Sequence, residues 1–338
     1  MADNRKKGLI FSFFPKGFFL FEKERKACRS GRIWLMRMAR DHVPNGITGS
    51  NPVSGVMKYG ISVWYGDKPL EKIFEVLSNY GFDYVEIFLC YPFPEKITEN
   101  LNKLKREYGL DIAFHAPCSG IHLSHPRKEI SDAALIIMKK CIKFASKFSP
   151  LYFNFHQSVE VETFEFEEVR KDVFAVTLKS TKNISELCRK FNIPVTIENN
   201  SSPFFGTPKQ LKSIFKNIHD INFCFDVGHV VKTNWKIRNY TGCLVKEKST
   251  INNWFKVFNK KILVVHLHDC LIENNEEPKD HLIFGNGSLD IEKICKMIKK
   301  TSCKYVTIET IFREKWKKRA LKNDLKNELD FCKTIIED

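Results

Sequence analysis

The stretch NFCFDVGHV, residues 222–230, begins as an apolar strand and ends in an aspartate and a histidine spaced three residues apart. Phe223, Cys224 and Phe225 are typical of a buried strand. Asp226 and His229 follow directly, and a carboxylate or an imidazole beside a core is costly to bury without a partner. The stretch therefore predicts a core strand whose end contributes to a functional site.

Seven further runs of this kind alternate with longer, charged segments of helical period. This alternation is typical of βα units around a parallel sheet. Eight units in about 280 residues favour a single-domain α/β fold, the closed (β/α)8 TIM barrel, although an open doubly wound sheet produces a similar pattern. The eight predicted strands are residues 59–64, 84–89, 111–115, 151–156, 194–198, 222–226, 262–268 and 304–309.

Residues 1–56 differ in composition from the rest of the chain. They contain six of the thirteen arginines and hold 11 Lys and Arg against 4 Asp and Glu. The tetrapeptide GSNP at residues 49–52 is what a common transfer-RNA T-arm sequence encodes in this frame. We expect residues 1–56 to be a non-native or disordered extension from a misassigned start, and residues 57–338 to form the barrel from Met57 onward.

Charge and cysteine content restrict the class of protein. The net charge of +15 suits anionic ligands such as phosphates or nucleic acid. Eleven cysteines without a CxxC pair favour a reducing cytoplasm over a disulfide framework. The apolar run at residues 9–21 is interrupted by Pro15 and Lys16 and is shorter than the about 20 residues of a membrane-spanning helix, which leaves a signal peptide as its other interpretation. We expect a cytoplasmic protein without a membrane segment.

Six consecutive predicted strands end in residues that can bind metals. In a barrel, the carboxyl ends of all eight strands meet on one face, where catalytic groups lie. A mixture of imidazoles and carboxylates suits Zn, Mn, Fe or Co, and the lack of thiols in the set disfavours a structural zinc site. These strand ends therefore predict a divalent-metal centre. They carry His115, His156, Glu198, Asp226 with His229, His266 with His268, and Glu309.

The strand-end motifs, taken in order, resemble those of the xylose isomerase-like TIM barrels. The motifs are FHAP (114–117), FNFHQ (153–157), TIENN (196–200), FDVGH (225–229), VVHLHD (264–269), DHLIFGNGSLD (280–290) and TIE (307–309). The superfamily contains sugar and sugar-phosphate isomerases and epimerases, and also the AP endonucleases of the endonuclease IV type. The resemblance extends over about residues 58–336.

In the isomerase and epimerase branch, the resemblance implies one divalent ion held by Glu198, Asp226, His266 and Glu309. It implies that Glu198 and Glu309 are catalytic, one removing a proton from a substrate carbon and the other returning it through an enediolate. It also implies a sugar or sugar phosphate as substrate. A second ion, or further substrate contacts, would then involve His115, His156, His229, His268, His281 and Lys279.

The endonuclease branch is the alternative that the resemblance leaves open, with nucleic acid as the partner. That branch implies a three-zinc cluster on the same strand ends together with His281, and an aspartate two residues before His281. Lys279 stands at that position and Asp280 is out of register. We expect Lys279 to repel a third cation, so this departure favours the isomerase branch.

Phosphate recognition has a predicted place as well. Barrels often bind phosphate in the loops after strands seven and eight. Here these loops contain Gly285 and Gly287 and the basic run at residues 313–319. The isomerase branch also places an arginine after strand seven to hold substrate, and in this chain Lys279 or His281 would have to replace it. The sequence therefore leaves two interpretations of the basic run open, a binding site for a substrate phosphate and a solvated helix face.

Overall fold

The computed structural model describes residues 56–159, 166–202, 204–239, 249–273, 276–314 and 318–337. The predicted extension at residues 1–56 lies, except for its last residue, outside the described part of the chain. Within the described ranges, no helix combines the length and the apolar character that crossing a membrane requires.

Eight parallel strands form a closed barrel in which β1 pairs with both β2 and β10. All eight coincide with the predicted runs, so the (β/α)8 prediction is confirmed. Around the barrel the order is β1-β10-β7-β6-β5-β4-β3-β2. The strands are β1 Lys58–Val63, β2 Tyr84–Phe88, β3 Asp111–His115, β4 Phe153–His156, β5 Val195–Glu198, β6 Asn222–Asp226, β7 Ile262–Leu267 and β10 Tyr305–Ile308.

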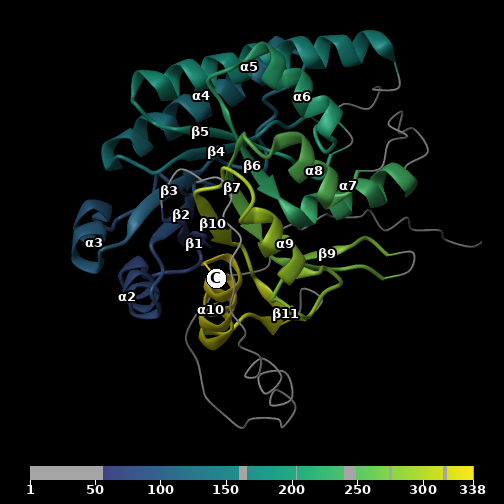
Figure 1. Cartoon of the computed structure of the whole chain (residues 1–338). Coiled ribbons are helices and arrows are strands. Elements are labelled where there is room, and N and C mark those ends of the chain that lie inside the picture. Colours follow the sequence, from purple (N-terminus) through teal and green to yellow (C-terminus); the bar gives the residue numbers. More distant parts are fainter. Residues whose placement is uncertain are drawn as a thin grey trace, which may run out of the picture.

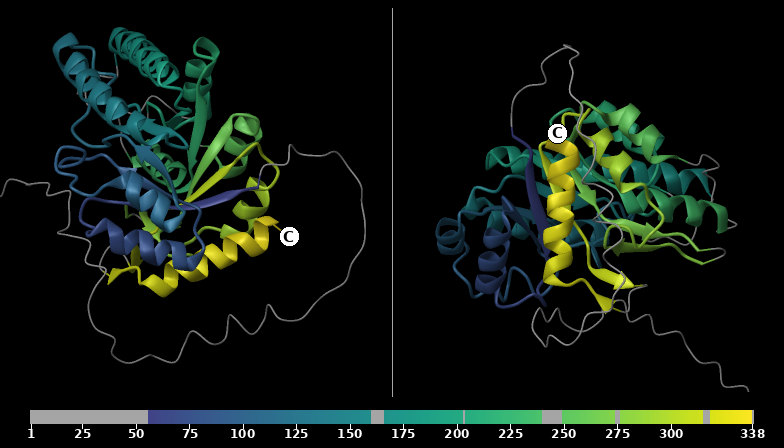
Figure 2. Two further views of the ribbon diagram at one scale, coloured as in Figure 1. Left: turned by 90° about the vertical axis from the view of Figure 1, so that its left-hand side faces the viewer. Right: turned by 60° about the horizontal axis from the view of Figure 1, so that its bottom comes forward.

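Helices surround the barrel and cover its outer face (Figure 1). Their apolar residues recur at helical spacing, so each helix buries one face against the strands. The last helix, α10, closes the ring next to α2. Lys333 of α10 donates a hydrogen bond to the carbonyl of Gly81, the residue directly after α2, and the two helices lie side by side in Figure 2. The helices are α2 Leu70–Tyr80, α3 Leu101–Tyr108, α4 Lys128–Ala145, α5 Glu167–Lys190, α6 Pro208–Asn217, α7 Val227–Asn239, α8 Ile251–Phe258, α9 Ile291–Ile298 and α10 Lys322–Glu337.

Aromatic side chains fill the amino-terminal half of the barrel interior. Tyr84, Tyr152 and Tyr305 contact one another with ring centroids 5.4 to 6.0 Å apart. Gly60 makes room for them, because a Cβ at this position would lie 2.3 Å from the Tyr84 ring. This layer closes the bottom of the barrel, so polar groups above it can be reached only from the carboxyl ends of the strands.

A second, four-stranded sheet lies beside the carboxyl ends of β7 and β10 and has no counterpart among the predicted strands. Its order is β12-β11-β9-β8. The strands are β8 Asp269–Leu271, β9 Lys279–Leu282, β11 Phe312–Glu314 and β12 Lys318–Arg319. Since the loops that follow β7 and β10 pair with each other here, this sheet fixes the position of His281 over the barrel.

Candidate metal centre

Glu198, at the end of β5, lies at the centre of a cluster of imidazoles. Its side chain is 1% exposed. The pairing of β4 with β5 places His156 directly opposite Glu198. Four imidazole nitrogens lie within 3.3 Å of its two carboxylate oxygens: His156 Nε2 at 2.9 Å, His115 Nε2 and His229 Nδ1 at 3.2 Å, and His266 Nδ1 at 3.3 Å.

Asp226 ends β6 and also caps the helix that follows it. Its Oδ1 accepts a hydrogen bond at 2.7 Å from the backbone N–H of His229 in the first turn of α7. Asn199 bonds both the N–H and the carbonyl of Asp226, at 2.9 and 2.8 Å, and so holds the ends of β5 and β6 together. The spacing of three residues between aspartate and histidine thus follows from capping geometry, which turns both side chains toward Glu198.

His266 joins the two catalytic candidates. On β7 it lies opposite Asp226 in the barrel register. Its Nδ1 is 3.3 Å from Glu198 Oε2 and 3.3 Å from Glu309 Oε2. One ligand atom each from Asp226, His266 and Glu309 lies within 4.8 Å of the others. The four residues predicted as metal ligands therefore converge.

His115 and His156 form a second donor group with Glu198, again with ligand atoms within 4.8 Å. The His115 ring stacks on Phe88 with centroids 3.9 Å apart, and Phe88 stacks on Trp64 at 4.1 Å. This aromatic stack crosses the ends of β1, β2 and β3 and gives one wall of the site an apolar character. The sequence did not single out Trp64 or Phe88.

His268 and His281 lie together on the other side, with ring centroids 4.3 Å apart. His268 Nε2 is 3.2 Å from Asp226 Oδ2, and its Nδ1 accepts the backbone N–H of His281 at 2.9 Å. Gly228 permits this packing, because a Cβ there would lie 2.2 Å from His268 Cε1. With Glu309, these two histidines form a further donor group.

The expectation that Lys279 repels a third cation stays a prediction. The ammonium group of Lys279 lies 2.5 Å from Glu276. Asp280 is 3% exposed, lies 3.7 Å from His281 Nε2, and pairs with Lys232 at 2.9 Å. The φ of +56° at His281 interrupts strand alternation, so Asp280 and His281 both face the site. Lys232, one helical turn after His229, approaches the cluster through its pairing with Asp280.

Glu86 is fully buried in the middle of β2. It accepts hydrogen bonds from Tyr152 and Thr307, and its Oε2 lies 3.2 Å from His266 Nε2. Cys224 lies beneath the cluster with its sulfur within 4.8 Å of ligand atoms of Glu198 and His266, so the expectation of a thiol-free set is wrong. Burial raises the pKa of Cys224 well above its usual value, which keeps this thiol protonated.

In the loop that contains Gly285 and Gly287, backbone N–H groups donate hydrogen bonds to a carboxylate of the protein itself. The carboxylate of Asp269 accepts backbone N–H bonds from Cys270, Gly285, Gly287 and Leu289 at 2.7 to 3.0 Å. A Cβ at Gly287 would lie 2.2 Å from Asp269 Oδ1, which explains the glycine. These amides are thus directed at Asp269, and the loop considered for phosphate binding is a structural turn. Part of the basic run, residues 315–317, lies outside the described residues.

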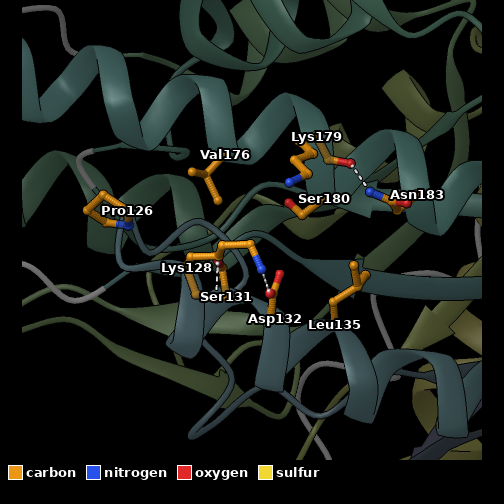
Figure 3. A pocket seen from close by; sticks show the side chains of 9 residues that line it. All are labelled: Pro126, Lys128, Ser131, Asp132, Leu135, Val176, Lys179, Ser180 and Asn183. Atoms are coloured by element: carbon orange, nitrogen blue, oxygen red, sulfur yellow. Dashed lines mark hydrogen bonds and ion pairs between the residues drawn. The ribbon is translucent and has the colours of Figure 1, made fainter.

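A separate hollow of about 230 Å³ lies between α4 and α5 (Figure 3). Lys128 and Asp132 form an ion pair on one side, and Lys179 and Ser180 lie on the other. The side chains that line it include none of the strand-end residues. The hollow is therefore distinct from the metal centre.

Residues 74–335 match the family model described as the xylose isomerase-like TIM barrel. The chain belongs to this family. No curated protein is significantly similar to this xylose isomerase-like barrel in sequence.

Solved structures of the same fold resemble this xylose isomerase-like barrel at low identity. D-psicose 3-epimerase from Clostridium cellulolyticum H10, solved with D-tagatose, is 16% identical, with a TM-score of 0.63, and the match covers 83% of this chain and 99% of that one. D-allulose 3-epimerase from Methylomonas sp., in complex with D-allulose, is 14% identical, with a TM-score of 0.61 and coverage of 83% and 96%. The IolI protein with a bound zinc atom is 15% identical, with a TM-score of 0.61 and coverage of 83% and 98%.

The electrostatics of this xylose isomerase-like barrel favour ionised carboxylates. Burial opposes ionisation of Glu198, but the His156 and His266 imidazoles outweigh it and hold the pKa of Glu198 well below its usual value. His229 and His268 likewise lower the pKa of Asp226 despite burial. Burial alone would lower the pKa of His229, but the Asp226 and Glu198 carboxylates outweigh it and raise this pKa to about 9.

The residues present fit a divalent cation. His266 Nδ1 is buried, makes no hydrogen bond to any described residue, and faces carboxylate oxygens of both Glu198 and Glu309. Several carboxylates brought together in a buried site require positive charge to offset their repulsion. Oxygen and imidazole donors in this mixture suit Zn, Mn, Co or Fe.

Proposed function

We propose that this chain is a divalent-metal-dependent isomerase or epimerase of a sugar or sugar phosphate. The observation that carries the proposal is that His266 Nδ1 lies 3.3 Å from a carboxylate oxygen of Glu198 and 3.3 Å from one of Glu309. Two ionisable carboxylates thereby flank one space at the open end of the barrel. Two bases on either side of a substrate carbon are what proton removal and return require.

Glu198, Asp226, His266 and Glu309 would hold the ion. When bound, it supplies a Lewis acid that polarises a substrate carbonyl and stabilises the negative charge that develops as the neighbouring carbon loses its proton. A second ion would use His115 and His156 together with Glu198, since their ligand atoms lie within 4.8 Å of one another.

Glu198 and Glu309 would exchange the proton with the substrate. The low pKa of Glu198 keeps its carboxylate ionised, so it can accept a proton. Glu309, on the other side of His266, is 4% exposed and would act at the opposite face of the same carbon. The tyrosine layer beneath, in which Tyr84 and Tyr152 are fully buried, limits access by water to the open end of the barrel.

The surroundings of the cluster suit a polyhydroxylated substrate. His229 is half-buried, carries a raised pKa, and would donate a hydrogen bond to a substrate oxygen. Lys232 and Asp280 supply a further donor and acceptor beside His281. The similar solved structures include epimerases with D-tagatose and with D-allulose, which supports a sugar as the substrate class.

The test is turnover in solvent deuterium with a panel of ketoses, aldoses and their phosphates. We expect a product that carries solvent deuterium at one carbon, and a loss of at least about 100-fold in kcat for Glu198→Gln and for Glu309→Gln, because each amide removes a proton-transfer group. Glu314→Gln, with an exposed side chain on β11, is the matched control. Full activity of Glu309→Gln would contradict the two-carboxylate mechanism.

An AP endonuclease of the endonuclease IV type is the second candidate. The donor group of His115, His156 and Glu198 favours it, because it provides a second ion site next to the first. The pairing of Asp280 with Lys232 counts against a third ion at His281. Cleavage of duplex DNA with an abasic site, with affinity falling steeply as salt rises, would support this alternative over the isomerase.

A further inference from the structure

Two partly exposed thiols lie together at the open end of the barrel, outside the metal centre. Cys90 follows β2, Cys118 follows β3, and their sulfurs are 3.5 Å apart. The other seven described cysteines are buried. A small oxidant can therefore reach this pair more easily than any other described thiol.

The strand pairing brings these two thiols together. Phe88 and His115 are opposite each other in the β2–β3 register, and the N–H of Leu89 continues the ladder to the carbonyl of His115 at 2.8 Å. Cys90 is the second residue after β2 and Cys118 the third residue after β3, and both lie in segments without helix or strand. The two loops therefore begin from a fixed separation, and neither cysteine is held in a helix or a paired strand.

The distance and surroundings suit a disulfide. A disulfide bond requires the sulfurs to approach from 3.5 Å to about 2.05 Å, which loop segments can accommodate more readily than paired strands. The two sulfurs are within hydrogen-bond distance, and either thiol can donate. The Cys118 thiol lowers the pKa of Cys90 most; with the Cys118 and Ser119 backbone and the His115 imidazole it outweighs burial and brings this pKa to about 6. Cys90 is thus the attacking thiolate of the pair, and Cys118 the resolving thiol.

We propose that Cys90 and Cys118 form a reversible dithiol–disulfide site that is oxidised by low-molecular-weight disulfides. The Cys90 thiolate attacks the small disulfide, forms a mixed disulfide and releases one small thiolate. The Cys118 thiol then gives up its proton and attacks the Cys90 sulfur, which releases the second small thiolate. Two protein thiols are oxidised and one small disulfide is reduced to two thiols.

The site would tie the loop after β2 to the loop after β3, the strand that ends in His115. Oxidation would then hold together two segments that border the entrance to the metal centre. The covalent chemistry itself depends on neither the metal nor the proposed reaction, so its test requires no substrate.

The test is oxidation of the reduced full-length chain with oxidised glutathione, followed by alkylation of free thiols and peptide mapping by mass spectrometry. We expect a peptide pair linked through Cys90 and Cys118 that dithiothreitol reverses. Cys295 and Cys332, buried between α9 and α10, are the internal control and should be alkylated only after unfolding. Cys118→Ser should stop at a glutathione adduct on Cys90, whereas Cys90→Ser should react at least about 10-fold more slowly.

The proposal would be overturned if Cys90 and Cys118 both stayed reduced under conditions that oxidise a model dithiol, or if they carried separate glutathione adducts that never resolved. Circular dichroism of both serine variants shows whether they fold. Since the readout is a covalent bond, an absence of isomerase activity would leave this result intact.

Discussion

Glu86 holds His266 through the nitrogen that faces away from the carboxylate pair. His266 Nε2 lies 3.2 Å from Glu86 Oε2, while Nδ1 faces Glu198 and Glu309. Tyr152 and Thr307 in turn donate hydrogen bonds to Glu86. A carboxylate behind a histidine fixes the tautomer and orientation of the ring and raises its basicity toward a metal. A residue buried in the barrel thus prepares a ligand above it.

Replacing Glu86 with glutamine should weaken metal binding although it changes none of the proposed metal ligands. The amide is a weaker acceptor for His266 Nε2–H, so we expect a loss of about 10- to 100-fold in affinity for Zn or Mn, measured by isothermal titration calorimetry. Glu75→Gln, an exposed position on α2, should leave the affinity unchanged. Equal affinities for both variants and the parent chain would mean that Glu86 does not orient His266.

Removing divalent ions should lower the melting temperature. Glu198, Asp226 and Glu309 are each no more than 4% exposed and lie close together, so an ion that binds only the folded state stabilises it by mass action. We expect chelation to lower Tm, and addition of Zn, Mn, Co or Fe to restore it, by differential scanning calorimetry. Asp226→Asn should reduce that restoration. Elemental mass spectrometry should find one or two ions per chain. A Tm that none of the four metals changes would contradict a metal centre at this site.

Asp269→Ala should destabilise the fold more than loss of an ordinary helix cap. It would leave four backbone N–H groups without their carboxylate, at a cost of roughly 3 to 5 kcal/mol. Asp290→Ala is the matched control, because Asp290 is exposed and caps α9 through one N–H bond, which is worth about 1 kcal/mol. Urea unfolding measures both, and equal losses would show that the Asp269 network adds no stability.

Stability should fall as the pH rises from about 4.5 to about 8. Burial raises the pKa of Glu328 to about 8 from an ordinary value of 4.5, so in this interval the folded chain binds more protons than the unfolded chain. The stability that the protonated group provides is present below the unfolded pKa and is lost as pH rises through the folded one. Asp67, whose pKa burial raises to about 8, acts in the same direction.

Glu328→Gln tests this pH dependence. The amide keeps an acceptor for the N–H of Phe284 and carries no charge, so its free energy of unfolding should decline less between pH 5 and pH 8.5, by roughly 3 to 5 kcal/mol. Denaturant titrations across this range measure the difference. The exposed Glu314→Gln should follow the parent chain, and an identical slope for Glu328→Gln would show that Glu328 is ionised in the folded state.

Local patterns were sufficient for the barrel strands and their polar ends. Each strand is a short apolar run that is bounded by turns and helical segments, and the parallel register brings the ends of neighbouring strands together. The register pairs His156 with Glu198 and Asp226 with His266 for this reason. The small sheet was not predicted, because its strands have two to four residues and are too short to show a period.

The sequence by itself determined the closed barrel and the convergence of Glu198, Asp226, His266 and Glu309, since both follow from strand order and from the face on which parallel strands end. Only the tertiary structure decided which lysine approaches the site. A positive φ at His281 turns Asp280 inward toward Lys232, while Lys279 pairs with Glu276. Such contacts depend on backbone dihedral angles and on segments distant in sequence, which no local pattern of residue types encodes.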